Sequence, residues 1–290
     1  MTTLRIATRS SQLARWQANR IADLLRNGQE IEVELVFIST QGDEHRDVPI
    51  HSLGGIGVFV KEVQQAVIDQ RADIAVHSAK DLPSTTATGL ILAAIPERAD
   101  VRDVLIGSRL DDIRDGGVVA TGSVRRRTQL RALRPDLQFA ELRGNIDTRI
   151  QRAKDFDAIV LAAAGLDRLG RAETIAQRLD VDAMMPQVGQ GALAVECRSD
   201  DSATIERLLK IDNVKHHRCV DAERAFLAGI GGGCDAPVGA YATMHGDEFS
   251  LDAIIANTSG VIHRVHTTGN EPAVVGSAAA TTLLRFAGAT

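Results

Sequence analysis

A single cysteine near the end of the chain has the surroundings of a reactive thiol. Cys234 follows three glycines and precedes Asp235 and Pro237, directly after a helical pattern that ends near Leu227. A cysteine that reacts as a thiolate has to be exposed, whereas one that only fills core volume is flanked by apolar residues. Covalent chemistry on the sulfur is one interpretation of this segment. The other is a glycine turn after a helix, with Cys234 starting the next strand.

Polar turns that follow short apolar runs suggest a second chemistry, the binding of anions. These turns span residues 8–11, 39–40, 77–83, 121–127 and 143–149. Free backbone N–H groups at the start of a helix favour an anion, and the planar fork of arginine matches a carboxylate. Each turn alone is explained as well by ordinary N-caps and solvated surface charges. Five such turns at equivalent positions favour a shared anion-binding site.

The elements that must position these turns alternate between strand and helix. Alternating apolar patterns predict strands at residues 4–7, 33–38, 74–76, 118–120 and 137–142. Helical spacing follows at residues 13–25 and 58–68, and a further helix is expected after the turn at 121–127. This order predicts mostly parallel sheets, in which ligands bind at the carboxyl ends of the strands.

The last part of the chain has a different order. Three strands are predicted in succession at residues 238–241, 249–255 and 261–267, and a helix at 272–286. Asn270 is a candidate cap for that helix, and Pro272 suits its first turn. We therefore expect a separate small α+β domain, which Cys234 enters on a loop.

Composition excludes several classes of protein. The 290 residues suit two or three compact units, and no apolar run is long enough to span a bilayer. A net charge of -5 and an aromatic content of 3% argue against a nucleic-acid binder. An early strand at Leu4 leaves no room for a secretory signal, so we expect a cytoplasmic protein with reduced thiols.

Motifs for nucleotides and metals are missing from the sequence. No lysine follows a glycine, which excludes a Walker loop, and no GxGxxG opens a βαβ unit. His216, His217 and Cys219 lie in a helical pattern in which adjacent side chains point apart, so no metal site is expected. Cys197 and Cys219 are predicted to be packing residues.

Eight ordered segments together resemble the porphobilinogen deaminase family, whose members are also called hydroxymethylbilane synthases. The resemblance runs almost end to end. Its carriers are residues 5–10 (RIATRS), 58–62 (VFVKE), 77–83 (HSAKDLP), 123–126 (SVRR), 142–149 (LRGN, then TR), 164–170 (AGLDRLG), 189–192 (GQGA) and 232–237 (GGC, then P). Two departures are Ile56, where the family often has lysine, and Pro186-Gln187, where it often has Pro-Ala.

The resemblance implies a fold of two α/β domains of the periplasmic-binding-protein type II kind plus a small C-terminal α+β domain. Domain 1 would comprise residues 1–95 and, after the chain returns, 189–211, with a lid loop at 41–57. Domain 2 would comprise residues 98–186 and carry anion-binding arginines. Domain 3 would comprise residues 214–290 and carry the cysteine loop.

The resemblance also implies the activity. Such an enzyme condenses four porphobilinogen molecules head to tail, with loss of ammonia, and releases linear hydroxymethylbilane. The growing chain is built on a dipyrromethane cofactor that a thioether holds on Cys234. The other expected properties are a monomer, no nucleic-acid or membrane partner, and a transient hand-off of product to the next enzyme.

Residue roles follow from the same resemblance. Catalytic roles fall to Asp81, Lys80 and Arg9. Cofactor contacts fall to Cys234, Ser78, Lys80, Asp81, Thr121, Ser123, Arg125, Arg126, Arg143, Gly144, Asn145, Gly189 and Gln190. Substrate contacts fall to Arg9, Ser10, Phe59, Arg143, Arg149 and Arg168. A chain of pyrroles with acetate and propionate arms needs many cations, which these arginines supply.

Asp81 is the expected stabiliser of the cation that develops on a pyrrole nitrogen when ammonia leaves. A carboxylate in that position stabilises positive charge and relays protons. Without the family pattern, Asp81 is explained as a turn carboxylate before Pro83.

Two other functions remain open at this stage. A two-lobed carboxylate-binding protein would use the same arginines but would leave Cys234 without a task. A thiol acyltransferase or amidase would use Cys234 as nucleophile and His77 as base.

Overall fold

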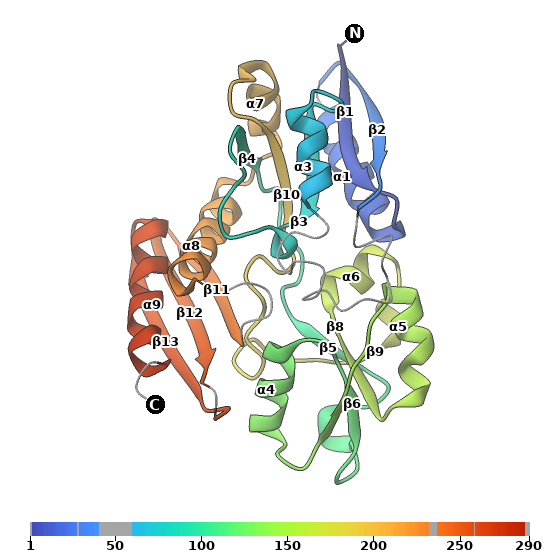
Figure 1. Cartoon of the computed structure of the whole chain (residues 1–290), viewed down its shortest axis with the longest axis vertical. Coiled ribbons are helices and arrows are strands. Elements are labelled where there is room, and N and C mark those ends of the chain that lie inside the picture. Colours follow the sequence, from blue (N-terminus) through green and yellow to red (C-terminus); the bar gives the residue numbers. More distant parts are fainter. Residues whose placement is uncertain (1, 28, 41–59, 232–236, 258, 288–290) are drawn as a thin grey trace. The chain divides into compact units, whose positions relative to one another are not determined.

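The computed structural model describes residues 2–27, 29–40, 60–231, 237–257 and 259–287 (Figure 1). The chain divides into two compact units. Unit 1 comprises residues 1–98 and 192–218, and unit 2 comprises residues 99–191 and 219–290. The second α/β sheet and the C-terminal sheet both belong to unit 2. The division into three domains stays a prediction.

Unit 1 is built on a five-stranded sheet with the order β2-β1-β3-β10-β4. Four strands are parallel, and β10 is antiparallel to both of its neighbours. Its elements are β1 (Thr2–Arg9), α1 (Gln12–Arg26), β2 (Ile31–Ile38), α3 (Lys61–Ile68), β3 (Ile74–Ser78), β4 (Leu90–Ala94), β10 (Leu193–Arg198) and α7 (Ser202–Leu209). A 3-10 turn (Ala79–Asp81) follows β3 directly.

Local sequence explains how the first strand, turn and helix form. The hydroxyl of Ser11 accepts a hydrogen bond from the Ala14 N–H and so caps α1. On the helix face below the cap, Ile21 and Leu25 are fully buried against Ile6 of β1. Burial of each such side chain contributes about 1.5–3 kcal/mol relative to exposure. The polar turn at 8–11 is therefore fixed between two well-anchored elements.

The sheet of unit 2 has the order β7-β6-β8-β5-β9. Its elements are β5 (Asp103–Ile106), β6 (Val118–Ala120), α4 (Val124–Leu133), β7 (Gln138–Ala140), α5 (Ile146–Arg152), β8 (Ala158–Ala162), α6 (Ala163–Arg168) and β9 (Ile175–Arg178). Strand β5 is antiparallel to both of its neighbours, and β6, β7 and β8 are parallel. Ser123 caps α4 through the Arg126 N–H, as Ser11 caps α1.

The two five-stranded sheets have the same topology. In each, the fourth strand in the order is the antiparallel one. Strand β5 follows β4 along the chain and joins the second sheet, and β10 follows β9 and joins the first. Each sheet is thus completed by a strand that comes directly after the last strand of the other sheet.

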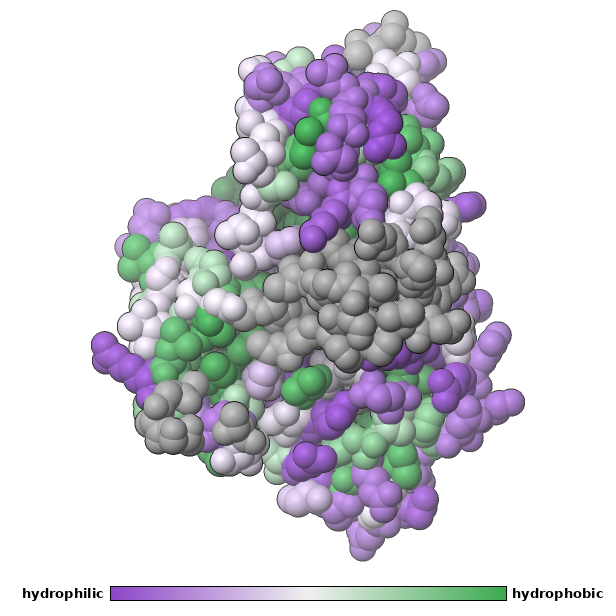
Figure 2. Space-filling model, in the orientation of Figure 1, coloured by the Kyte–Doolittle hydropathy of each residue, from purple (hydrophilic) through white to green (hydrophobic). Residues whose placement is uncertain are grey.

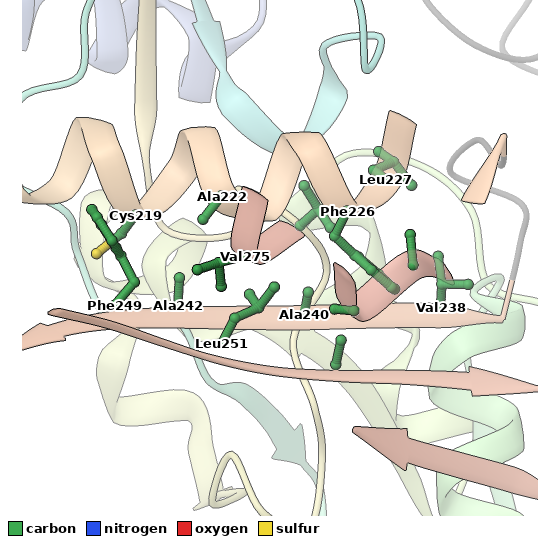
Figure 3. Close-up of a cluster of buried hydrophobic side chains, with 14 of the residues drawn as sticks. Cys219, Ala222, Phe226, Leu227, Val238, Ala240, Ala242, Phe249, Leu251 and Val275 are labelled. Carbon is green, nitrogen blue, oxygen red and sulfur yellow. The ribbon is translucent and has the colours of Figure 1, made fainter. Parts of the chain in front are cut away.

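The C-terminal part of unit 2 is a three-stranded antiparallel sheet, β11-β12-β13, with two helices. Its elements are α8 (Val214–Ile230), β11 (Val238–His245), β12 (Glu248–Ala256), β13 (Ile262–Gly269) and α9 (Pro272–Ala287). Figure 3 shows Cys219 and Phe226 of α8 facing Leu251 of β12 and Val275 of α9 across one apolar core. The predicted packing role of Cys219 is confirmed, and Cys197 is fully buried as well.

The predicted fold class is confirmed: two α/β sheets, each with four parallel strands, precede a C-terminal α+β part. Predicted and observed bounds agree within three residues for the predicted elements, including β7 and α3, except that β11 continues to His245 instead of ending at Tyr241. Figure 2 shows a face on which hydrophilic residues predominate, with smaller apolar areas between them. Within the described ranges, no helix is long and apolar enough to cross a membrane.

Candidate active site

A pocket in unit 1 lies where β1 and β3 end. The residues that line it are Arg9, Ser11, Leu13, Ala14, Gln17, Val60, Val63, Val76, His77, Ser78 and Asp81. Because β1 and β3 are parallel, their carboxyl ends meet at the same edge of the sheet. Two of the predicted anion-binding turns, 8–11 and 77–83, are therefore brought to one pocket.

Hydrogen bonds hold the turn that carries Asp81. The Ala79 N–H donates to the Ala192 carbonyl (3.0 Å), and the Leu82 N–H donates to the Ala79 carbonyl (3.2 Å). The side-chain amide of Gln17 donates to the Ser78 hydroxyl (2.8 Å). The turn is thus tied by its backbone to the residue before β10 and by a side chain to α1.

Three predicted residues, Arg9, Ser78 and Asp81, line this pocket together. Lys80 lies half-buried in the same turn but is not part of the lining. Ser10 is exposed, and its carbonyl accepts a hydrogen bond from the Arg15 side chain (2.9 Å). No hydrogen bond or ion pair to another described residue is found for the Asp81 carboxylate, so it is available to a ligand.

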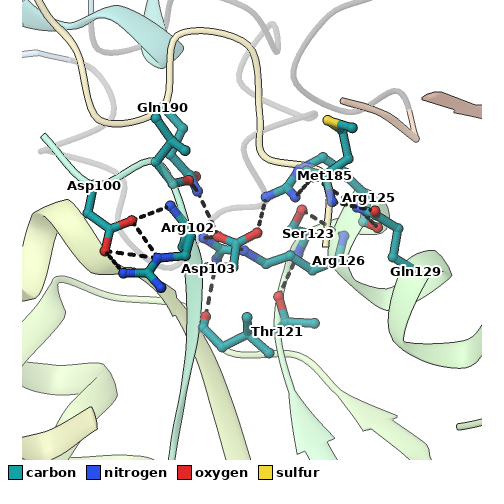
Figure 4. Close-up of polar contacts among 12 residues, drawn as sticks. Asp100, Arg102, Asp103, Thr121, Ser123, Arg125, Arg126, Gln129, Met185 and Gln190 are labelled. Carbon is teal, nitrogen blue, oxygen red and sulfur yellow. Dashed lines mark hydrogen bonds and ion pairs between the residues drawn. The ribbon is translucent and has the colours of Figure 1, made fainter. Parts of the chain in front are cut away.

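A second group of predicted residues forms a buried ion cluster in unit 2 (Figure 4). Asp103, which begins β5, is fully buried, and it lies 2.7 Å from one guanidinium nitrogen of Arg125 and 2.7 Å from one of Arg126. Arg125 also donates to the Met185 carbonyl, and Arg126 donates to the Val160 carbonyl (3.1 Å). Both arginines are less than a tenth exposed.

The cluster holds more positive than negative charge. Two guanidinium groups face one carboxylate, which leaves one positive charge in a buried site. Burial opposes ionisation of Asp103, but the charges of Arg125 and Arg126 outweigh that cost and hold its pKa well below its usual range. The Arg125 Nε atom is buried without a hydrogen-bond partner among the described residues. An anion placed here would therefore gain both a hydrogen bond and charge neutralisation.

The predicted Gly189-Gln190 segment joins this cluster to α8. The Gln190 amide donates to the Val101 carbonyl (2.7 Å) and to Asp103 (2.9 Å). The Gly189 N–H donates to the buried carboxylate of Glu223 (2.8 Å). Gly191 has φ +86°, and a Cβ there would lie 2.6 Å from the Ala99 carbonyl oxygen, so only glycine fits. Gln190 therefore contacts the arginine cluster through Asp103.

Four predicted residues lie in the turn between β7 and α5 and in the first turns of α5. The Asn145 side chain caps α5 by accepting a hydrogen bond from the Thr148 N–H (2.8 Å). Arg149 donates to the Gly144 carbonyl (2.7 Å), and the Arg143 side chain is 40% exposed and 3.8 Å from Glu141. The cationic groups at this turn are therefore near the surface, in contrast to Arg125 and Arg126.

Arg168 is a half-buried member of the predicted substrate-binding arginines. It donates to the Gly191 carbonyl (2.7 Å), and burial lowers its pKa to about 10, so it stays charged at neutral pH. Thr121 is buried, and its hydroxyl accepts a hydrogen bond from the Ser123 N–H (3.2 Å). Thr121 and Ser123 therefore shape the turn before α4.

Asp103 and Gln17 are positioning residues that the sequence analysis missed. Asp103 stands directly before the apolar run Val104–Ile106, where a charged residue is unusual, and that position was the available signal. Gln17 lies on a helix face that is otherwise apolar. Cys234, Phe59, Ile56 and the expected lid at 41–57 lie outside the described residues.

The sequence comparisons agree over the whole chain. Residues 4–206 match the family model for the porphobilinogen deaminase dipyrromethane cofactor binding domain, and residues 217–285 match the model for the C-terminal domain. The chain is 43% identical to the porphobilinogen deaminase of Brevibacillus brevis, covering 97% of this chain and 93% of the relative. It is 45% identical to that of Roseiflexus castenholzii, covering 99% and 97%.

One solved structure with a weaker similarity is immunogenic lipoprotein A from Vibrio vulnificus. It aligns with a TM-score of 0.45 at 10% identity, over 76% of this chain and 98% of that chain. The family models and the two relatives together cover both units, including the pocket and the arginine cluster. The chain belongs to the porphobilinogen deaminase family.

Proposed function

We propose that the pocket of unit 1 is where each porphobilinogen molecule loses ammonia, with Asp81 as the carboxylate that stabilises the resulting pyrrolic cation. The activity itself follows from the family: four porphobilinogen molecules are condensed head to tail, and hydroxymethylbilane is released. The rival functions, a carboxylate-binding protein and a thiol acyltransferase, are set aside by that membership.

The observation that carries this proposal is that Asp81 and Arg9 line the same pocket. Porphobilinogen has two carboxylate arms and one aminomethyl group. An arginine orients a carboxylate arm, and the Asp81 carboxylate, for which no partner is found among the described residues, is available for the pyrrole N–H. When the C–N bond breaks, nitrogen leaves with the electron pair, and positive charge spreads onto the pyrrole nitrogen. A preorganised carboxylate stabilises that charge.

The arginine cluster of unit 2 fits the acidic arms of the dipyrromethane cofactor. The buried excess positive charge and the unpartnered Nε of Arg125 match a carboxylate. Arg125 and Arg126 would hold that group, and Cys234 would bind it covalently. When bound, the cofactor supplies the nucleophilic pyrrole on which the product is built.

The more exposed arginines suit a product that grows. Arg143 and Arg149 would bind the arms of successive rings, and Arg168 would bind substrate near the Gly191 segment. A cytoplasmic, monomeric enzyme that hands product to the next enzyme is part of the same proposal.

The mass of intact, freshly purified protein tests the cofactor part of the proposal. We expect an adduct of two condensed pyrrole units, absent in Cys234→Ala and retained in the matched control Cys219→Ala. A colour reaction with an acidic aldehyde reagent for pyrroles should follow the adduct. A native protein with only its polypeptide mass, which porphobilinogen does not load, would contradict the proposal.

A further inference from the structure

One residue that lines the pocket, the buried His77, contacts a buried glutamate, and the proposed function has used neither of them. The Nε2 atom of His77 lies 3.2 Å from Oε2 of Glu196, and these two side chains are 4% and 1% exposed. Gln64 of α3 donates its side-chain amide to both oxygens of Glu196, at 2.9 and 3.1 Å. The three residues come from β3, β10 and α3 of unit 1.

Strand pairing explains why these side chains meet. Ala194 lies opposite His77 in the antiparallel pair of β10 and β3, so Glu196 is the diagonal neighbour on the same face. Helix α3 covers this face and contributes Gln64. Strand β10 is the strand that returns from the other sheet, so the pair exists only after the chain has crossed back.

The charges of the network are unusual for a core. Glu196 is fully buried, and its contacts among the described residues are an amide and an imidazole, with no arginine or lysine. A buried carboxylate is costly unless it is paired. If the imidazole carries a proton, the pair becomes neutral. Glu196 therefore supplies the counter-charge for the imidazolium that forms when His77 takes up a proton.

We propose that His77 accepts the proton released in each condensation, and that Glu196 and Gln64 position its ring. The proposal rests on the assignment of the pocket as the active site, because His77 lines that pocket beside Ser78 and Asp81. The charged and titratable groups that face His77 are Glu196 from β10, Arg9 at the end of β1, and Asp81 in the turn after β3.

The condensation releases one proton for each bond formed, and a base has to accept that proton. When a substrate-derived ring attacks with its free α-carbon, a C–C bond forms, and that carbon still carries its hydrogen. The C–H bond then breaks, its electron pair restores the aromatic ring, and the proton moves to His77. His77 passes the proton on to the released ammonia, which departs as ammonium. Asp81 thereby keeps its charge for the pyrrolic cation.

An isotope effect distinguishes proton transfer from a structural role. We would measure the rates of the second and later additions within a single turnover, using porphobilinogen that carries deuterium on its free α-carbon, because the attacking ring in those additions comes from the labelled substrate. Loss of a positioned acid or base typically costs about 10²–10⁴-fold, so His77→Gln should lower the rate by at least about a hundredfold. Its isotope effect should rise above that of the native enzyme, because C–H cleavage becomes limiting. A slow variant with an unchanged isotope effect would overturn the proposal.

Glu196→Gln keeps the volume of the side chain and removes its charge. We expect Glu196→Gln to raise the isotope effect as well, with a smaller loss of rate than in His77→Gln. If His77→Gln does not fold, Glu196→Gln tests the proposal in its place. His266→Gln is the matched control, because that histidine also faces a carboxylate, Asp252 at 3.0 Å, but is 55% exposed. It should leave rate and isotope effect unchanged.

A readout independent of turnover is the ¹⁵N spectrum of the histidine rings. The His77 signal, assigned by its loss in His77→Gln, should shift in Glu196→Gln and not in His266→Gln. An unshifted signal would rule out the pair. Asp81→Asn separates the two proposals. Normal turnover in Asp81→Asn would reject the pocket assignment. Slow turnover in Asp81→Asn, together with an unchanged isotope effect in His77→Gln, would reject only the proton transfer.

Discussion

The side-chain amide of Gln17 in α1 donates a hydrogen bond of 2.8 Å to the hydroxyl of Ser78 at the end of β3. This bond links the first helix to the turn that holds Asp81, and both residues line the pocket. The pocket geometry therefore depends on a contact between segments about sixty positions apart in the chain.

Gln17→Leu should reduce turnover without abolishing it. The substitution leaves the Ser78 hydroxyl without its donor in a part-buried site, which costs about 1–3 kcal/mol of folding stability. We expect a lower unfolding midpoint in urea and a lower kcat, because the turn is less well fixed. Asn19→Leu, an exposed position on the same helix, is the control and should change neither. If Gln17→Leu and Asn19→Leu have the same unfolding midpoint and kcat, the bond between Gln17 and Ser78 does not contribute to turnover.

Asp81→Asn should lower turnover by about a hundredfold to a thousandfold or more, the usual effect of losing a preorganised electrostatic group. Asparagine keeps the volume of the side chain but has no charge to offer the pyrrolic cation. Cofactor attachment should remain largely possible, which intact mass would show. A variant with a near-normal rate would remove Asp81 from the mechanism.

Arg143→Leu and Arg149→Leu should each block particular elongation steps. Arg143 lies in the turn before α5 and Arg149 lies within α5, both near the surface, and we propose that they bind the arms of added rings. Native mass spectrometry should show a changed distribution of enzyme-bound intermediates. Arg152→Leu, half-exposed at the end of the same helix, is the matched control. If the distribution stays the same in all three variants, the turn does not bind the growing chain.

Asp103→Asn should destabilise unit 2 by about 3–5 kcal/mol, the usual cost of removing one partner of a buried ion pair. Two buried guanidinium groups would then repel each other without a counter-charge. Urea unfolding measures the loss, and Asp252→Asn, which is partly exposed, should cost less than about 0.5 kcal/mol.

The same carboxylate predicts a pH dependence. The pKa of Asp103 in the folded protein lies far below its ordinary value of 3.8, so the unfolded chain binds the proton first. Its contribution is complete at neutral pH and is lost as the pH falls below about 4. The acid unfolding curve of Asp103→Asn should accordingly be flatter than that of the native protein in this range. Parallel acid unfolding curves for Asp103→Asn and the native protein would contradict this prediction.

His216 should make unit 1 less stable in mild acid. Its Nδ1 atom accepts a hydrogen bond from the Arg98 N–H (3.2 Å), and burial together with the charge of Arg98 lowers its pKa below 6.5. The unfolded state therefore takes up the proton first, and stability falls as the pH drops below 6.5. His216→Gln keeps an acceptor that does not titrate, so its melting temperature should change less between pH 7.5 and 5.5. The exposed His245→Gln should behave like the native protein.

The sequence predicted the elements whose signals are local. Strands β1, β3 and β6, their polar turns and the C-terminal strands and helix all follow from apolar spacing and capping residues such as Ser11 and Ser123. The pairing of β10 with β3 was beyond such reasoning, because no local pattern says which distant strand completes a sheet. The return of the chain was expected only from the family resemblance.

The sequence predicted which residues belong to the site, but it did not predict which groups these residues contact. Arg125 and Arg126, which the family resemblance assigned to the cofactor, belong to one cluster, but their common partner Asp103 was not foreseen. An ion pair between a strand and a helix depends on the packing of both, which spacing along one segment does not encode. The role of Gln17 could not be predicted for the same reason, because a polar residue on an apolar helix face does not show which group it bonds to.

The exchange of antiparallel strands between the two sheets has a consequence for biosynthesis. While the ribosome has produced only the first hundred or so residues, β3 and β4 lack the strand that belongs between them, and their inner edges have no hydrogen-bond partners. Those edges stay open until Leu193–Arg198 emerges, after the whole second sheet. A fragment that stops at Arg98 should therefore aggregate, whereas one that is joined directly to the returning segment should stay monomeric.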